Sequence, residues 1–180
     1  QEQVNDGIVV DSLVERYDAK YALSKTVFDE VGKGKTLHRL SENVVPTITT
    51  FSTGEPSFLF NDGKYLTSFN TDGSDVFSST EFTLSVKFEG DYNQVLVSRW
   101  KANDNIVFNT ASFKLYGNRI QTFENTYVFS EEPNENSVNS LIVTFNRNTQ
   151  RLNAYLNGKN VLSTETDSSD FPISSKEPFI

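Results

Sequence analysis

Five residues of the chain carry the groups that proteins use to recognise sugars. An aromatic ring can stack on the apolar face of a sugar, while guanidinium, amide and carboxylate groups hydrogen-bond its hydroxyls. The candidate ligand-binding residues are Arg99, Trp100, Asp104, Tyr116 and Tyr127. They form a site only if the fold brings them together. The alternative for Trp100 is a core position, because it ends an apolar strand.

Oxygen-bearing side chains soon after Trp100 could hold a cation. Calcium takes six or more oxygen ligands, and Asn103, Asp104 and Asn105 supply three neighbouring side chains of that kind. They are the candidate metal site: no cofactor is required, and calcium is the ion these ligands would suit. The alternative is a turn built from residues that tolerate unusual backbone angles. Similar clusters occur at Asn61-Asp62, at Asp72 with Asp75, and at Asp167 with Asp170.

The remaining reactive residues do not form a catalytic pattern. His38 is the only histidine, and no nucleophile motif lies near it, so we predict a structural histidine. The segment Lys33-Gly-Lys-Thr36 ends like a phosphate-binding loop, but Asp29 stands where that motif needs glycine. We therefore predict a charged turn there.

Composition narrows the class of protein. The chain has 180 residues, a net charge of −8, and neither cysteine nor methionine. Its length suits one domain with a substantial core. Disulfides and thiolate metal sites are excluded, and the acidic balance disfavours nucleic acid or an anionic membrane as partner. Because Gln1 is not methionine, we expect it to follow a removed leader, a proteolytic cut or a sequence boundary.

Alternation of apolar and polar residues predicts the elements that must position these groups. In Glu81–Phe88, the residues Phe82, Leu84, Val86 and Phe88 share one face of an extended chain, which is typical of a half-buried strand. The pattern returns in 140–145 and in 151–158. The second of these ends in Asn157-Gly158, a dipeptide that favours a tight hairpin.

Further strands are expected at short intervals. A hairpin is predicted from 57–60 and 64–69 around Asn61-Asp62-Gly63, and a second around Gly117-Asn118. Residues 1–11 are expected to form an arm or linker, and 12–180 one domain. Short strands with no long helix favour a two-sheet antiparallel jelly-roll sandwich. The other predicted strands are 12–17, a short one within 28–40, 94–100, 111–116, 119–123 and 126–129.

The order of these pieces is similar to that of a known group. The most specific piece is the final hairpin, where Val143-Thr-Phe145 precedes Tyr155-Leu-Asn-Gly-Lys159. Over about residues 12–180, the chain resembles the concanavalin A-like lectin/glucanase superfamily, and more narrowly its laminin-G-like jelly rolls. The other segments that carry the resemblance are 13–18, 28–32, 56–66, 82–86, 95–98 and 113–116.

The resemblance implies two curved antiparallel sheets, often one calcium ion at a loop edge, and uses that are adhesive, glycan-binding, protein-binding or structural. Members usually continue past the position of Phe179-Ile180 with a strand that pairs beside the first strand, here 13–17. We therefore expect either a continuation of the native chain or strand pairing with a neighbouring subunit.

The glucanase branch of that superfamily uses Glu-x-Asp-x-x-Glu on one strand. The closest segment here is Glu89-Gly-Asp-Tyr-Asn-Gln94, which ends in glutamine and falls between two predicted strands. Because Gln94 cannot donate and recover a proton, the sequence predicts a solvated turn rather than a catalytic pair.

Together these features predict a non-enzymatic surface-displayed module that binds glycan or protein, on a secreted bacterial protein or a phage appendage. Its expected location is extracellular or on a virion surface. The first alternative is a structural or decoration protein of an assembly, without sugar binding. The second is a glycoside hydrolase. A shared fold does not choose among these uses.

Overall fold

The computed structural model describes residues 46–61, 64, 81–99 and 113–171, together with Ala19 and the backbone of four two-residue strands. Every element within these residues is a β-strand, so the all-β prediction is confirmed for them. No helix in the described part is long and apolar enough to cross a membrane. The chain divides into two compact units, 1–69 and 70–180.

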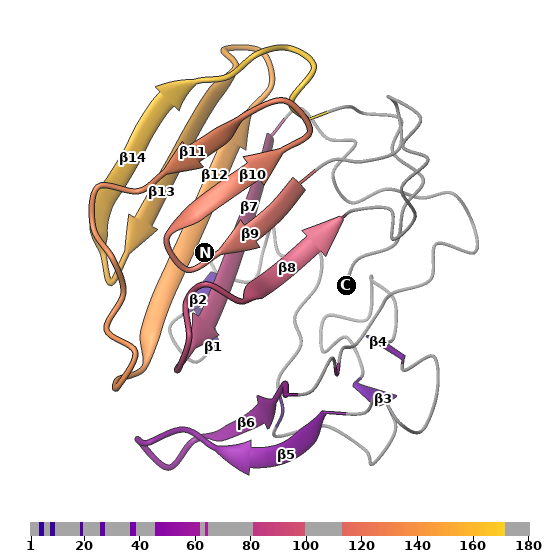
Figure 1. The fold of residues 1–180 in the computed structure, drawn as a ribbon, viewed down its shortest axis with the longest axis vertical. Helices are drawn as coiled ribbons and strands as arrows, with labels where there is room; N and C mark the ends of the chain where they lie inside the picture. Colours follow the sequence, from indigo (N-terminus) through magenta and orange to yellow (C-terminus); the bar gives the residue numbers. More distant parts are fainter. Residues whose placement is uncertain are drawn as a thin grey trace. The chain divides into compact units, whose positions relative to one another are not determined.

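The described residues of the first unit form three two-stranded antiparallel pairs (Figure 1). Two are short: β1 (Val4–Asn5) with β2 (Ile8–Val9), and β3 (Thr26–Val27) with β4 (Leu37–His38). The β1–β2 pair lies within the predicted arm, and the predicted domain boundary after residue 11 lies outside the described residues. His38 is in β4, as the predicted short strand requires, but its side chain is not described.

The third pair differs from the hairpin predicted for this region. The strand predicted at 57–60 is present as β6 (Pro56–Leu59), but its described partner is β5 (Thr47–Thr50), for which no strand was predicted. The turn between them is closed by a hydrogen bond of 2.9 Å from the Gly54 N–H to the Phe51 carbonyl. The partner predicted at 64–69 lies outside the described residues, apart from Lys64.

In the second unit, residues 81–99 and 113–171 form two four-stranded antiparallel sheets (Figure 1). One has the order β14-β13-β12-β7 and the other the order β11-β10-β9-β8. The strands of the first are β7 (Glu81–Phe88), β12 (Asn139–Asn146), β13 (Arg151–Leu156) and β14 (Lys159–Glu165). The strands of the second are β8 (Val95–Arg99), β9 (Phe113–Tyr116), β10 (Arg119–Thr122) and β11 (Thr126–Val128). All the strands predicted between 81 and 158 are therefore confirmed.

The alternation predicted for β7 sets its pairing register with β12. Val86, Leu84 and Phe82 lie opposite inward-facing apolar residues of that strand. The polar residues between them are exposed. A shift by one residue would bring those polar side chains into the core, so burial of one face fixes the register. The partners are Leu141, Val143 and Phe145, in that order.

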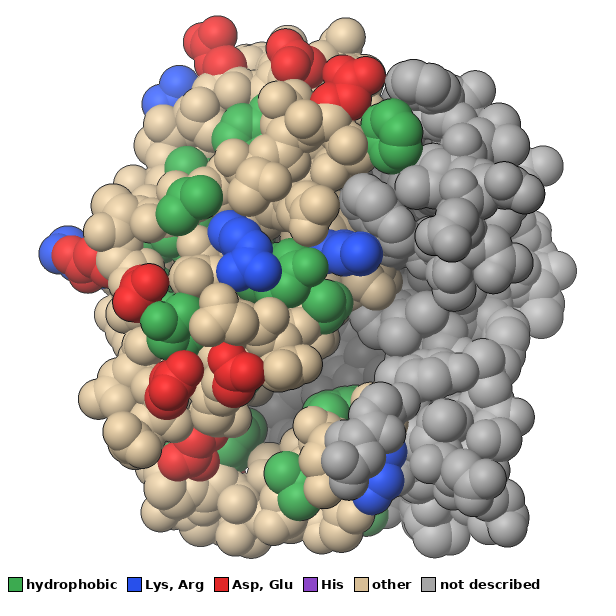
Figure 2. All heavy atoms as spheres, viewed as in Figure 1, with side chains coloured by type: hydrophobic (Ala, Val, Ile, Leu, Met, Phe, Trp, Pro, Cys, Tyr) green, Lys and Arg blue, Asp and Glu red, His purple; other side chains and the backbone are tan. Residues whose placement is uncertain are grey.

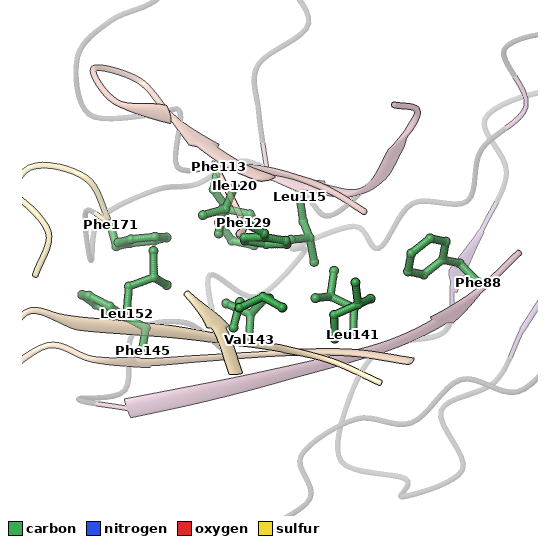
Figure 3. Packing of buried hydrophobic residues seen from close by; sticks show 13 residues of the cluster. Phe88, Phe113, Leu115, Ile120, Phe129, Leu141, Val143, Phe145, Leu152 and Phe171 are labelled. Atoms are coloured by element: carbon green, nitrogen blue, oxygen red, sulfur yellow. The ribbon is translucent and has the colours of Figure 1, made fainter. Parts of the chain in front are cut away.

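The core of this unit lies between the inner faces of the two sheets, as in a β-sandwich (Figure 3). The rings of Phe82 and Phe113 stack from opposite sheets with centroids 6.3 Å apart, and Phe171 packs 4.5 Å from Phe145. The large apolar side chains that are buried almost completely are Phe113, Leu115 and Ile120 from one sheet, Leu141, Val143, Phe145 and Leu152 from the other, and Phe171 after β14.

The predicted Asn157-Gly158 turn joins β13 to β14. Both residues have positive φ angles, 50° and 82°, which a two-residue hairpin of this hand requires. The turn is also tied to the neighbouring strand, because the N–H of Ser140 donates to Asn157 Oδ1 at 2.8 Å. This confirms the most specific local prediction of the sequence.

Candidate functional site

Of the predicted ligand-binding residues, two are described with their side chains, one is described by its backbone alone, and the others lie outside the described residues. Tyr116 ends β9, and Tyr127 is the middle residue of β11. Arg99 ends β8, paired with Phe113, but its side chain is not described. The other candidates, Trp100 and the metal-site residues Asn103, Asp104 and Asn105, lie outside the described residues.

Tyr116 and Tyr127 are not brought together, because they lie on opposite faces of the same sheet. Tyr127 pairs with Ile120, a core residue, and its own ring packs against the core. Tyr116 alternates with buried Leu115 and therefore faces outward. The two tyrosines cannot form one aromatic platform.

Tyr127 instead belongs to a buried polar cluster around Asp170, whose side chain is 2% exposed. The hydroxyls of Thr122 and Tyr127 each donate to the Asp170 carboxylate. Asn125 Nδ2 donates to Asp170 Oδ1 at 3.1 Å, and the Asp167 N–H donates to Oδ2 at 3.1 Å. This Asp170 cluster connects the β10–β11 turn to the segment that follows β14.

Burial, followed by the hydrogen bond and the charge of Asp170, raises the pKa of Tyr127 above its ordinary value of 10.0. The phenol therefore remains a proton donor to the carboxylate at neutral pH. Both Asp170 oxygens are occupied by protein donors, an arrangement that stabilises the fold and leaves little access for a cation. Within the described residues, no group of three or more His, Asp or Glu side chains could hold a metal ion.

The outer face of the β8–β11 sheet carries a second polar cluster, centred on Tyr116. The guanidinium carbon of Arg119 lies 3.7 Å from the centroid of the Tyr116 ring, a cation–π contact. The Tyr116 hydroxyl donates to Gln121 Oε1 at 3.4 Å. Lys114 lies on the same face, because it pairs with Gln121 and alternates with buried residues. We call Lys114, Tyr116, Arg119 and Gln121 the Tyr116 face.

Arg119 is held in place by amide groups from two turns. Its Nη1 donates to Asn118 Oδ1 at 2.8 Å and to Asn93 Oδ1 at 3.3 Å. Asn93 is in turn fixed by its N–H, which donates to Asp91 Oδ1 at 2.8 Å. The guanidinium is therefore pre-positioned on the tyrosine ring before any ligand arrives.

The β7–β8 turn that supplies Asn93 is the segment that resembles the glucanase motif. It is a turn, as predicted, and Gly90 adopts a φ of 107° within it. Gln94 Nε2 donates to Asp91 Oδ2 at 3.1 Å, so the glutamine at the third motif position supports the turn. Hydrogen bonds from the Asn93 backbone and the Gln94 side chain lower the pKa of Asp91.

Close packing attaches this turn to the β9–β10 hairpin. The Gly117 N–H donates to the Tyr92 carbonyl at 3.0 Å. A Cβ on Gly117 would lie 2.6 Å from the Cβ of Tyr92 and 2.9 Å from the ring of Phe88, so only glycine fits there. A hydrogen bond with Glu132 raises the pKa of Tyr92.

The charge of the sheet differs from that of the whole protein. Strands β8 to β11 contain three basic residues, Arg99, Lys114 and Arg119, and no Asp or Glu, although the chain carries −8 overall. Figure 2 shows Lys and Arg side chains in the middle of this face, beside hydrophobic side chains, with Asp and Glu toward its edges.

Sequence reasoning identified Tyr116 but missed Arg119, Gln121 and Asn93. The signal for Arg119 was the Gly117-Asn118 turn, because a two-residue hairpin places the residue after it across from the residue before it. Nothing local in the sequence joins Asn93 to Arg119, since they are 26 residues apart.

No protein-family model matches the chain, and neither a curated protein nor a solved structure matches it. The resemblance to laminin-G-like jelly rolls therefore remains a prediction that is based on residue patterns.

Proposed function

We propose that the chain is a non-catalytic, surface-displayed module that binds glycan through the Tyr116 face of a laminin-G-like jelly roll. The single observation that carries the proposal is the stack of Arg119 on Tyr116, with Gln121 hydrogen-bonded to the tyrosine hydroxyl. Its location would be extracellular or on a virion surface.

The chemistry of the face suits a saccharide. A sugar offers weakly polar C–H groups to an aromatic ring and hydroxyls to hydrogen-bonding side chains. Tyr116 supplies the ring, Gln121 an amide, and Arg119 a planar set of donors. All three are partly exposed on a regular sheet, which positions a binding site more rigidly than a loop does.

The surroundings of Asp91 and Asp170 support a binding role rather than hydrolysis. A glycosidase needs a carboxylic acid and a carboxylate that face the same substrate. Asp170 is buried among protein donors, and Asp91 accepts hydrogen bonds within its own turn. Neither is placed as one member of such a pair.

One observation favours the alternative of a protein contact within an assembly. Val128, opposite Arg119 on β11, is 64% exposed, and Val95, paired with Tyr116 on β8, is 43% exposed. Aliphatic side chains on both sides of the Tyr–Arg pair would suit a protein surface. The structural alternative predicts self-association or binding to an assembly protein, with no glycan retained.

The test is a glycan array probed with and without calcium. We expect the wild-type chain to bind a subset of glycans and Tyr116→Ala to lose that binding. Tyr155→Ala is the matched control, because Tyr155 is a half-buried tyrosine on the other four-stranded sheet. Binding in neither calcium condition would reject glycan recognition. Release of reducing ends from a bound polysaccharide would instead indicate a hydrolase.

A further inference from the structure

The Asn157-Gly158 turn between β13 and β14 combines a reactive dipeptide with several hydrogen bonds. It is the only Asn-Gly dipeptide of the chain, and both of its residues are exposed to water. A glycine after an asparagine has no side chain to shield its backbone nitrogen. That nitrogen can attack the side-chain amide carbon of the asparagine without an enzyme. The turn therefore has the chemistry of a deamidation site.

Deamidation replaces the amide of Asn157 by a carboxyl group in two steps. In the first, the Gly158 nitrogen bonds to the amide carbon, the bond from that carbon to Nδ2 breaks, and ammonia leaves with the proton of the Gly158 nitrogen. In the second, water opens the resulting cyclic imide at one of its two carbonyls. The product is aspartate or isoaspartate, in which the main chain runs through the former side chain. One water is consumed and one ammonia is released.

In the folded chain, the amide of Asn157 is held toward β12. Its Oδ1 accepts from the Ser140 N–H at 2.8 Å, and its Nδ2 donates to Asn139 Oδ1 at 3.1 Å. The Asn157 N–H also donates to the Ser140 carbonyl at 2.8 Å. Attack requires the amide carbon to approach the Gly158 nitrogen, so the hydrogen bonds that hold the amide oppose the reaction. Deamidation should therefore proceed mainly from molecules in which the hairpin has opened.

Asn139, which receives the Asn157 amide, cannot adapt to a carboxylate. It is 0% exposed. Its Nδ2 donates to the Asn134 carbonyl at 2.7 Å and to the Ser137 carbonyl at 2.9 Å, so its Oδ1 is the atom that faces Asn157. Turning the Asn139 amide over would place its oxygen against those two carbonyl oxygens.

Deamidation would place a carboxylate oxygen where Asn157 Nδ2 now donates. The hydrogen bond to Asn139 Oδ1 is then lost, and two acceptor oxygens face each other at a buried group. Isoaspartate also adds a main-chain carbon, which a two-residue turn with φ angles of 50° and 82° does not accommodate. The modified chain therefore loses a contact that joins the β13–β14 turn to the start of β12.

We propose that Asn157-Gly158 is a site of spontaneous deamidation that the intact turn suppresses, and that the modified turn no longer restores its contact with Asn139. Opening of the hairpin is reversible, but ammonia once released is not recovered. The site therefore converts transient opening of β13 and β14 into a lasting loss of stability. This inference does not depend on the proposed function, because the turn belongs to the sheet that does not carry Tyr116.

The experiment follows deamidation of the whole chain at mildly alkaline pH, both in buffer and in urea that unfolds it. Trypsin cleaves after Arg151 and Lys159 and so releases the peptide 152–159. Mass spectrometry detects the exchange of the amide NH2 for OH, and chromatography separates aspartate from isoaspartate. Asn153 is an internal control on the same peptide, because it precedes Ala154 rather than glycine.

Two variants separate the chemistry from the fold. In Gly158→Ala, the added methyl group should hinder attack by the backbone nitrogen even in urea, so this result does not require the variant to fold. Its Cβ would lie in open space, but a φ of 82° strains alanine, so its stability is compared only before and after incubation. Asn157→Asp supplies the aspartate product directly, without a step of unfolding and refolding.

We expect Asn157 to deamidate at least about 10-fold more slowly in the folded wild type than in urea, as a reaction that requires local opening predicts. Asn153 and the Gly158→Ala chain should change little in either condition. Wild-type chain incubated in urea and then refolded should unfold at a lower urea concentration than chain unfolded only briefly. Gly158→Ala should show no such difference, and Asn157→Asp should unfold at a lower urea concentration than the wild type.

Three results would overturn the inference. No modification of Asn157 in either condition would reject the site, and equal rates in the folded and unfolded chain would reject suppression by the turn. Wild-type stability of both the deamidated chain and Asn157→Asp would reject the loss of the Asn139 contact. Each of these results leaves glycan binding at the Tyr116 face to be decided by its own array.

Discussion

Strand β10 connects two polar clusters that use similar chemical groups in different surroundings. At its C-terminal end, Asp170 is 2% exposed, and its carboxylate accepts hydrogen bonds from Thr122, Tyr127 and Asn125. At its N-terminal end, Asp91 lies in an exposed turn, and Arg119 stacks on a tyrosine with part of its guanidinium open.

The difference teaches where a ligand can act. In the Asp170 cluster, burial requires that each polar group find a protein partner, so the groups are consumed in stabilising the fold. At the Tyr116 face, solvent can satisfy the groups that the protein does not, so donors remain for a ligand. The same comparison separates two predicted ligand-binding residues. Tyr127 takes part in the Asp170 cluster, whereas Tyr116 is partly exposed on the outer face of the sheet.

The largest expected effect is the loss of the buried carboxylate. Asp170→Ala removes the shared acceptor of buried Thr122 and of half-buried Asn125 and Tyr127, and should lower the free energy of unfolding by about 3 kcal/mol. Urea denaturation followed by circular dichroism measures this. Asp91→Ala is the matched control and should have a small effect. Equal losses for the two variants would contradict the comparison.

At the N-terminal end of β10, close packing rather than charge should dominate the stability of the fold. Gly117→Ala introduces a methyl group 2.6 Å from the Cβ of Tyr92, and should cost about 1–3 kcal/mol, as overpacking typically does. Asn118→Ala, one residue later, adds no such clash and is the control for the turn. A thermal melt of Gly117→Ala that matches the wild type would show that the turn can move away from the hairpin.

Tyr127→Phe removes one donor of the Asp170 cluster and should cost about 1 kcal/mol at neutral pH. Because the folded-state pKa of Tyr127 is raised above its ordinary 10.0, the folded chain keeps a proton that the unfolded chain loses. This stabilisation is complete below about pH 10 and is lost as the pH rises further. The variant should therefore lose less stability than the wild type between about pH 10 and pH 11.

Denaturation curves at those two pH values test this. Identical alkaline slopes for Tyr127→Phe and the wild type would show that the phenol ionises alike in the folded and unfolded chains.

The smallest effect is expected from the exposed carboxylate. The pKa of Asp91 is lowered from its ordinary 3.8, so its stabilising contribution is present above that pH and is lost as the pH falls through the lower folded value. Asp91→Asn should leave stability at pH 7 nearly unchanged and slightly flatten the acid side of the profile. A carboxyl titration by NMR measures the shift directly, and a midpoint at or above 3.8 would contradict it.

The parts of the fold that the sequence predicted are those where one face of a strand is buried. β7 and β12 alternate because Leu84 and Val143 pack toward the other sheet while their neighbours face water. The β5 strand, Thr47–Thr50, was not predicted because all four of its residues are exposed. Its sequence therefore has no alternation of apolar and polar residues that burial of one face would produce. Strands of that kind depend on their partner more than on their own pattern.

The candidate site was predictable only as far as its contacts are local. Tyr116 has an evident aromatic role, and a hairpin turn places Arg119 beside it. The Asp170 cluster had no such signal, because Thr122 and Asp170 meet across 48 residues of sequence. Whether a tyrosine faces outward depends on the register of its strand. In the neighbouring β8–β9 pairing, a bulge between Val95 and Val97 shifts the register.

The order of strands in the first sheet has a consequence for the folding pathway. β12, β13 and β14 follow one another through short turns, and closing such local hairpins is fast. β7 must instead find β12 from far away, since Glu81 and Asn146 meet across 65 residues. Long-range pairing must first overcome the entropy of closing that loop. Destabilising changes in β7 should therefore speed unfolding, whereas changes in the β12–β14 meander should slow folding.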